Sequence, residues 1–87
     1  MKSRKALYEA LKGIPGAVVP KTYKGLSNEV YGKKAVCYPS FTDMAARRAG
    51  ERALTDLGFK VETNYGGDNY PVTSVPVSYF KGWHWDE

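Results

Sequence analysis

The stretch from Gly25 to Lys34 has the residue types of a phosphate-binding loop, since Gly32-Lys33-Lys34 follows an earlier glycine. Such a loop needs four residues between its glycines and a Ser or Thr after the lysine, whose hydroxyl binds Mg²⁺. In this chain six residues separate Gly25 from Gly32, and Lys34 stands where the hydroxyl residue is needed. The spacing therefore argues against a nucleotide-binding loop.

Ser78, His84 and Asp86 have the side-chain types of a hydrolase triad. No glycine-flanked turn surrounds Ser78, and the alternation of a strand gives the three residues no reason to converge. His84, Asp86 and Glu87 offer few and weak ligands for a divalent cation. Cys37 has no histidine or helix terminus beside it to activate its thiol, which indicates a packing role. We therefore expect no catalytic activity, no cofactor and no bound metal.

Lysines stand beside tyrosines in two segments, Lys21-Thr22-Tyr23-Lys24 and Tyr31-Gly32-Lys33-Lys34. Because lysines neutralise phosphates and tyrosines stack on bases, this pattern is compatible with nucleic-acid binding. In the alternative, Tyr23 packs in the core and the lysines only keep the surface soluble. We predict that a partner is oriented by a basic patch made of Lys21, Lys24, Lys33 and Lys34.

The last part of the chain is rich in aromatic residues. Trp83 and Trp85 are two positions apart, and Trp is the residue type most enriched at binding hot spots. In the alternative, one of them continues the inward row Val75, Val77 and Tyr79 and closes the core. Tyr70 belongs to the glycine-rich segment 66–71, which is typical of an exposed loop. The predicted anchoring contacts are Tyr70, Trp83 and Trp85.

Apolar residues recur at helical spacing in two stretches. Ser3 can cap the first helix, which buries Leu7, Leu11 and Ile14. In the second helix Ser40 or Thr42 is the expected cap, Asp43 lies in the first turn, and Gly58 ends the helix. Its expected buried stripe is Ala46, Ala49, Gly50, Ala53, Leu54 and Leu57. Its solvent side would be a secondary basic face of Arg47, Arg48 and Arg52, with Arg47 paired to Glu51.

Strand-like runs follow each helix: residues 17–23 and 34–38 after the first, and residues 59–65 and 72–80 after the second. Alternation predicts that Phe59, Val61, Thr63, Tyr65, Val75, Val77 and Tyr79 face inward. The opposite, solvated face would carry Thr22, Cys37, Lys60, Glu62, Asn64, Ser74 and Ser78. Pro20 and Pro76 predict edge strands or bulges. The two hairpin loops would be residues 24–33 and 66–71.

The two halves align as two copies of one helix-strand-strand unit, over residues 3–39 and 43–81, with an unmatched tail at 82–87. Common ancestry of the halves and chance agreement both remain open. An isolated hairpin with one helix buries too little surface, so both units would share one core in a single domain of residues 1–87. The expected fold class is α+β, a pseudo-duplicated αββ-αββ chain with about four antiparallel strands and two helices on one face.

The charge is unevenly distributed along the 87 residues, whose net charge is +4. Residues 1–40 contain eight basic and two acidic side chains, whereas residues 41–87 contain five basic and seven acidic ones. Such a dipolar molecule can orient a charged partner. A single Cys excludes a disulfide framework and favours the reducing cytoplasm. The sequence shows neither a signal peptide nor an apolar run long enough to span a membrane.

In size, single-domain economy and lack of catalytic groups, the chain is similar to small accessory proteins of bacteriophages. That resemblance implies a protein that acts by occupying a surface. The leading hypothesis is a non-enzymatic binding protein that docks on a larger protein or nucleoprotein and blocks or adapts it, for example as an anti-defence inhibitor. The alternative is a nucleic-acid-binding module that uses the basic first half. The protein would be a monomer, or a homodimer paired along an exposed hairpin edge.

Overall fold

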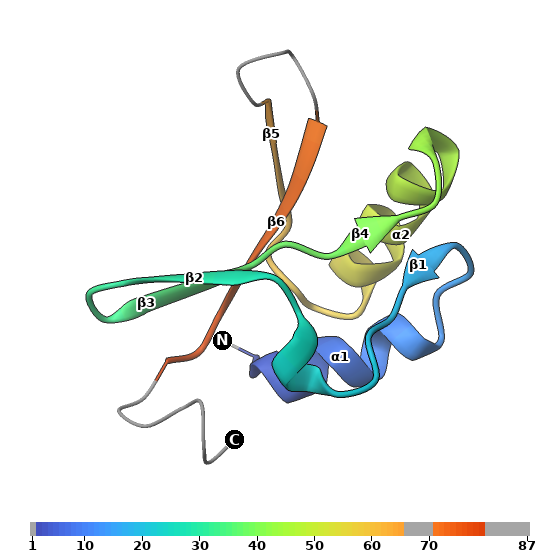
Figure 1. The fold of residues 1–87 in the computed structure, drawn as a ribbon. Coiled ribbons are helices and arrows are strands. Elements are labelled where there is room, and N and C mark those ends of the chain that lie inside the picture. Colours follow the sequence, from blue (N-terminus) through green and yellow to red (C-terminus); the bar gives the residue numbers. More distant parts are fainter. Residues whose placement is uncertain (1, 66–70, 80–87) are drawn as a thin grey trace.

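A computed structural model describes residues 2–65 and 71–79, which form an α+β fold with two helices and two antiparallel sheets (Figure 1). The helices are α1 (Arg4–Lys12) and α2 (Met44–Asp56), and a 3₁₀ helix, η1, spans Tyr23–Gly25. The strands are β1 (Ala17–Val18), β2 (Asn28–Tyr31), β3 (Lys34–Cys37), β4 (Ser40–Phe41), β5 (Glu62–Tyr65) and β6 (Pro71–Val77).

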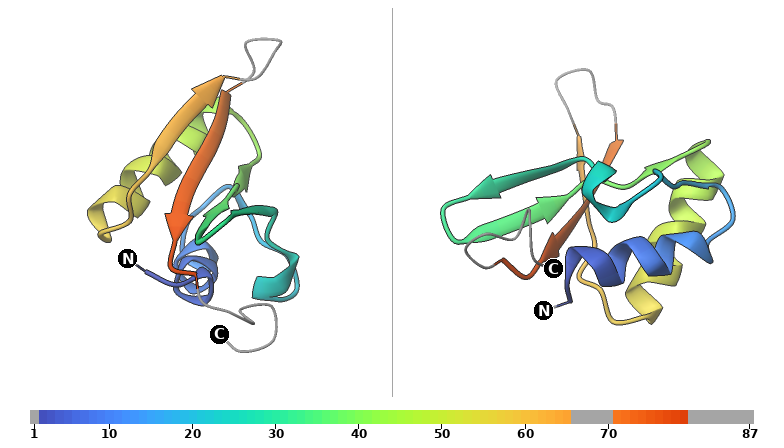
Figure 2. Two further views of the ribbon diagram at one scale, coloured as in Figure 1. Left: turned by 90° about the vertical axis from the view of Figure 1, so that its left-hand side faces the viewer. Right: turned by 60° about the horizontal axis from the view of Figure 1, so that its bottom comes forward.

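The larger sheet has the strand order β2-β3-β6-β5, and the smaller one pairs β1 with β4. Figure 2 shows α2 beside the β5–β6 hairpin and α1 below the end of β6. The Ser78 amide donates to the Lys2 carbonyl at 2.9 Å, which ties the end of β6 to the start of α1. The core between these elements includes Leu7 and Leu11 from α1, Leu54 from α2 and Val75 from β6.

Helix α1 follows the sequence expectation closely. The Ala6 amide donates to Ser3 Oγ at 3.0 Å, so Ser3 is the N-cap. Leu7, Leu11 and Ile14 are buried, as predicted. Tyr8 is buried as well, and its hydroxyl lies 2.9 Å and 2.8 Å from the carbonyls of Pro20 and Lys21. This contact holds the segment before η1 against α1.

Helix α2 begins at a different cap from the one expected. Asp43 is the N-cap and accepts from the Ala46 amide at 2.8 Å, whereas Ser40 belongs to β4. The expected end at Gly58 is confirmed, with φ at +95°. The Phe59 amide donates to the Leu54 carbonyl at 3.0 Å and both side chains are buried, which is a Schellman motif with its apolar contact.

The buried side of α2 is rotated from the predicted stripe. Gly50 and Leu54 are buried as expected, but Leu57 is 54% exposed and Ala49 is exposed. The ring of Phe41 lies directly on Gly50, where an added Cβ would come within 2.7 Å of Phe41 Cζ. Ala46 and Ala53 are half-buried, and so are the polar residues Arg47 and Glu51, which widen the packed side beyond the predicted stripe.

The second predicted hairpin is confirmed, since β5 and β6 are antiparallel and pair Glu62 with Ser74 and Tyr65 with Pro71. The first is different: residues 24–33 are not a loop but contain η1 and β2, and β2 turns into β3 through Gly32-Lys33. Gly32 has φ of +59°, as a tight two-residue turn requires. Of residues 17–23 only Ala17 and Val18 form a strand, β1; Pro20 lies beyond it and Tyr23 begins η1.

Two expectations about the sheet faces and one about an edge strand were wrong. Cys37 is 0% exposed, because it pairs with the core residue Val75 and directly opposed residues share a face. Tyr65 is 68% exposed at the end of β5 rather than inward. Pro76 lies in the inner strand β6, not at an edge. It is tolerated there because β6 pairs with β5 only as far as Ser74 and Pro76 pairs with β3.

The duplicated organisation and the placement of both helices on one face stay predictions. The order helix-strand-strand describes α2, β5 and β6, whereas four strands and η1 follow α1. The matched pair Tyr23 and Tyr65 lies in η1 and β5, respectively. No helix within residues 2–65 and 71–79 is long and apolar enough to cross a membrane.

Candidate functional site

The strand register places one set of polar and aromatic side chains on the sheet face opposite Ala35, Cys37, Val75 and Val77. We call it the tyrosine face; its residues are Glu29, Tyr31, Lys34, Val36, Tyr38, Glu62, Asn64, Val72, Ser74 and Pro76. All are exposed or half-buried except Ser74. The predicted polar positions Glu62, Asn64 and Ser74 do lie together on this face, and Asn64 Nδ2 donates to Ser74 Oγ at 2.8 Å.

A hydrogen-bonded cluster joins β2 to the end of β3 on the tyrosine face. The Tyr31 hydroxyl donates to a Glu29 carboxylate oxygen, and the hydroxyls of Tyr31 and Tyr38 are 3.2 Å apart. The backbone positions of the two tyrosines are about 13 Å apart along the hairpin, so their side chains lean toward each other along the strands.

The same cluster controls the ionisation of Tyr31. The hydrogen bond to Glu29, and then the one with Tyr38, raise the pKa of Tyr31 above its ordinary value of 10.0. The contact with Glu29 stabilises the protonated phenol, because a phenolate could not donate to a carboxylate. Tyr31 is 53% exposed, so the cluster presents a neutral, oriented phenol to solvent at physiological pH.

Two hollows of about 480 and 440 Å³ adjoin the cluster and share Ser27, Tyr38 and Val72 in their walls. The smaller one lies across the tyrosine face and includes Asn64 and Ser74. The larger one continues past Phe41 toward the first turn of α2, where Met44 and Arg47 line it. The two hollows therefore adjoin at Tyr38, and together we call them the bent groove.

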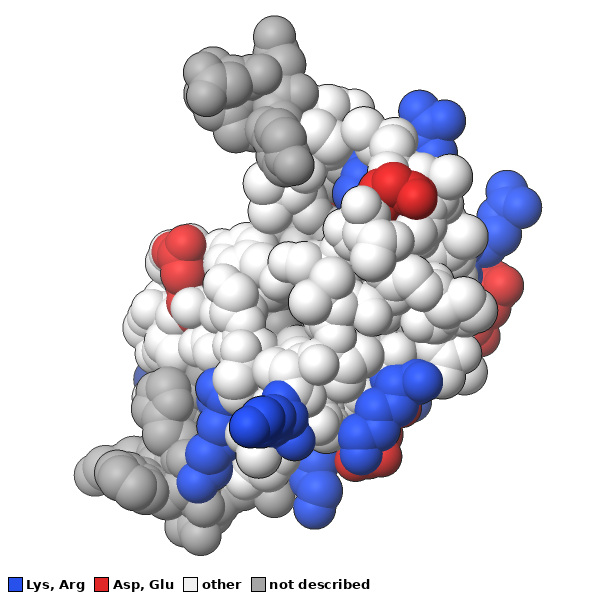
Figure 3. Space-filling view, turned by 45° about the vertical axis from the view of Figure 1, so that its right-hand side comes forward, with Lys and Arg blue, Asp and Glu red and all other residues white. Residues whose placement is uncertain are grey.

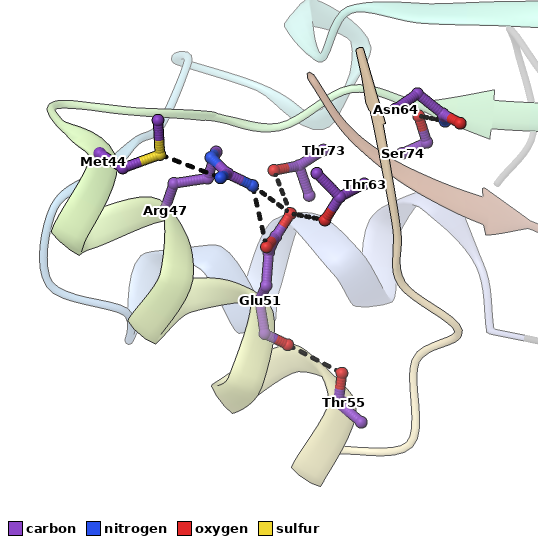
Figure 4. A network of polar contacts seen from close by, with 8 residues as sticks. All are labelled: Met44, Arg47, Glu51, Thr55, Thr63, Asn64, Thr73 and Ser74. Atoms are coloured by element: carbon purple, nitrogen blue, oxygen red, sulfur yellow. Dashed lines mark hydrogen bonds and ion pairs between the residues drawn. The ribbon is translucent and has the colours of Figure 1, made fainter. Parts of the chain in front are cut away.

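Arg47 and Glu51 form a polar network at the α2 end of this groove (Figure 4). Arg47 Nη1 lies 3.0 Å from both Glu51 carboxylate oxygens, which confirms the predicted ion pair. Glu51 also accepts from Thr63 Oγ1 at 3.0 Å and from Thr73 Oγ1 at 2.7 Å, so the network joins α2 to both strands of the hairpin. The two charged side chains are only 12% and 16% exposed.

The predicted secondary basic face therefore loses one of its members. Arg47 points to the groove and to Glu51, whereas Arg48 and Arg52 are exposed on α2. Because the Arg47–Glu51 ion pair is largely buried, Arg47 contributes to the packing of α2 and does not belong to a solvated basic surface.

The predicted lysine patch is divided into two groups. Lys21 and Lys24 lie before and within η1, whereas Lys33 and Lys34 lie at the β2–β3 turn. The four residues of β2 separate the groups by about 13 Å of strand. Tyr23 packs partly buried against the core with the Arg4 guanidinium 5.1 Å from its ring centre, so it takes the packing role foreseen in the alternative.

The predicted anchors Tyr70, Trp83 and Trp85 lie outside the described residues. Sequence reasoning did not single out Glu29 and Tyr38, and it placed Glu51 only in the pair with Arg47, not in contact with Thr63 and Thr73. The spacing of Glu29 and Tyr31, two residues apart in an extended run, was a usable signal for a shared strand face. The contact with Tyr38 depends on the register of β2 and β3, which no local pattern specifies.

Comparisons with known proteins do not assign a family. No protein-family model matches the chain, and no curated protein or solved structure shows significant similarity to it.

Proposed function

We propose that this chain is a small non-enzymatic binding protein that docks by its tyrosine face on a larger protein and blocks or adapts it. The observation that carries the proposal is the hydrogen-bonded cluster of Glu29, Tyr31 and Tyr38 beside the bent groove. This is the mode of action of the phage accessory proteins that the chain resembles, and a cytoplasmic site of action is part of the proposal.

The cluster has the properties of a pre-organised contact. Tyrosine supplies a large amphipathic surface and loses little conformational entropy on binding, because it has only two side-chain torsions. Hydrogen bonds already hold the Tyr31 side chain in the free protein, so less ordering remains to be done when a partner arrives. The half-buried Val36, Val72 and Pro76 add apolar area around it.

Charge favours a protein partner at this face. Glu29 and Glu62 are exposed there, and Lys34 is the single basic residue of the set. Two carboxylates repel a phosphate backbone, whereas they attract lysine, arginine or amide donors on a protein surface. The partner surface that fits the tyrosine face therefore combines apolar side chains with basic or amide groups.

The test compares capture by the wild-type protein with capture by Tyr31→Ser from a host lysate, followed by affinity measurement with the purified partner. Loss of a central aromatic anchor lowers affinity by about 30-fold, equivalent to about 2 kcal/mol. The matched control is Leu57→Ser, which removes another large exposed side chain, on α2. Equal affinities for wild type and a folded Tyr31→Ser would overturn the proposal, as would an equal loss in Leu57→Ser.

A further inference from the structure

Exposed lysines from α1 and from the η1 segment lie around one buried tyrosine. Tyr8 holds the carbonyls of Pro20 and Lys21 on α1, and the Lys12 ammonium lies 4.8 Å from the centre of the Tyr8 ring. The Arg4 guanidinium lies 5.1 Å from the ring of Tyr23, the first residue of η1, so the two segments are joined at a second point.

These contacts gather the positive charge of the first part of the chain. Between residues 2 and 25 the sequence has six Lys and Arg residues and a single acid, Glu9. Glu9 lies 3.2 Å from Lys12 and offsets one of these charges. Residues 2–25 therefore keep a strongly positive net charge. Figure 3 shows Lys and Arg side chains gathered along the lower part of the molecule, where α1 and η1 lie. We name Lys5, Lys12, Lys21 and Lys24 the α1–η1 basic face; all four are exposed.

We propose that the α1–η1 basic face binds the phosphate backbone of double-stranded nucleic acid. Lysines bind phosphates as point charges, and the release of counterions from the duplex supplies the free energy. Tyr8 is 7% exposed, and Tyr23 is half-buried with the Arg4 guanidinium 5.1 Å from its ring centre, so within the described residues this face offers little aromatic surface for stacking on bases. Binding is therefore independent of base sequence and favours the duplex, which has the higher charge density.

This surface is separate from the tyrosine face, and the two differ in charge. A protein with both can hold a larger protein through one surface and the nucleic acid bound to that protein through the other. The proposed duplex binding does not depend on docking by the tyrosine face, because the two surfaces share no residue. Tyr31→Ser, which tests the docking, leaves all four lysines in place.

The experiment is a fluorescence anisotropy titration of a labelled duplex of about 20 base pairs at salt concentrations from about 50 to about 200 mM. Four phosphate contacts predict a slope of log K against log salt of about −3.6, and hence an affinity loss of about 10²-fold over this range. Replacing the four lysines of the α1–η1 basic face by glutamine should bring the slope close to zero and lower the affinity at low salt by more than about tenfold.

The matched control carries Lys33→Gln, Lys34→Gln, Arg48→Gln and Arg52→Gln, which also removes four charges but leaves the α1–η1 basic face intact. It should keep the wild-type slope, as should Tyr31→Ser, and circular dichroism shows whether each variant is folded. Three results would each refute the inference: no duplex binding by the wild type in dilute buffer, an equal loss in the control, or tighter binding to a single strand than to the duplex.

Discussion

Glu51 is the acceptor of four polar contacts, and replacing it by methionine tests whether the network in Figure 4 holds α2 on the hairpin. Glu51→Met keeps the side-chain volume and the helix propensity but leaves the half-buried Arg47 charge and the buried Thr73 hydroxyl without this acceptor. Removing one partner of a fully buried ion pair costs about 3–5 kcal/mol. Since both side chains retain some exposure to water, we expect a loss of about 2–3 kcal/mol.

The assay is urea unfolding followed by circular dichroism, together with thermal melting. A loss of about 2–3 kcal/mol lowers the melting temperature by about 10–20 °C for a domain of this size. Arg48→Met, on the exposed side of the same helix, is the control and should stay within about 0.5 kcal/mol of wild type.

A double-mutant cycle separates the ion pair from the rest of the network. Arg47→Met with Glu51→Met removes both charges, so the combined loss should be smaller than the sum of the two single losses, by about 1–2 kcal/mol. If Glu51→Met unfolds at the wild-type urea concentration, or if the two losses simply add, the network does not stabilise the fold in the way described.

Three further expectations concern other parts of the chain. Gly58→Ala places a Cβ at φ of +95° and should lower the free energy of unfolding by about 1–2 kcal/mol, and an unchanged urea midpoint would contradict the strain argument. The raised pKa of Tyr31 means that its contribution to stability is complete below about pH 10 and is lost at higher pH. The difference in tyrosinate absorbance between wild type and Tyr31→Phe should therefore appear above pH 10, and Glu29→Gln should move it down; a transition at or below pH 10 in the wild type would be inconsistent with the cluster. If Trp83 and Trp85 anchor the partner, replacing both by alanine in a protein that stays folded should abolish capture; retained capture would remove them from the contact.

Local signals in the sequence were sufficient for much of the fold. The Ser3 cap, the apolar spacing of α1, the end of α2 at Gly58 and the β5–β6 hairpin all follow from residues within one element or its direct neighbour. The stripe of α2 was misplaced because a reading by hydrophobicity assigns Arg47 to solvent. In the structure its charge is compensated by Glu51, so the arginine lies on the packed side.

Pairings between distant residues could not be predicted in this way. Residues 28–31 lack the alternating apolar pattern of a half-buried strand, so their sequence predicts a loop where the structure has β2. The two-residue pairing of Ala17 with Phe41 and of Val18 with Ser40 is too short to leave a periodic signal. The prediction of a single lysine patch failed for the same reason, because β2 is the element that separates the two groups of lysines.

The larger sheet is a union of two hairpins that meet along a single seam. That seam is the pairing of Ala35, Val36 and Cys37 with Val77, Pro76 and Val75, residues 38 to 42 positions apart in the chain. Each hairpin closes a short loop, whereas the seam closes a long one at a greater entropic cost, so it should form late in folding and open early in unfolding. Cys37, the sole cysteine, lies in this seam and has no exposed surface. The rate at which a thiol reagent labels Cys37 therefore measures how often the two hairpins separate.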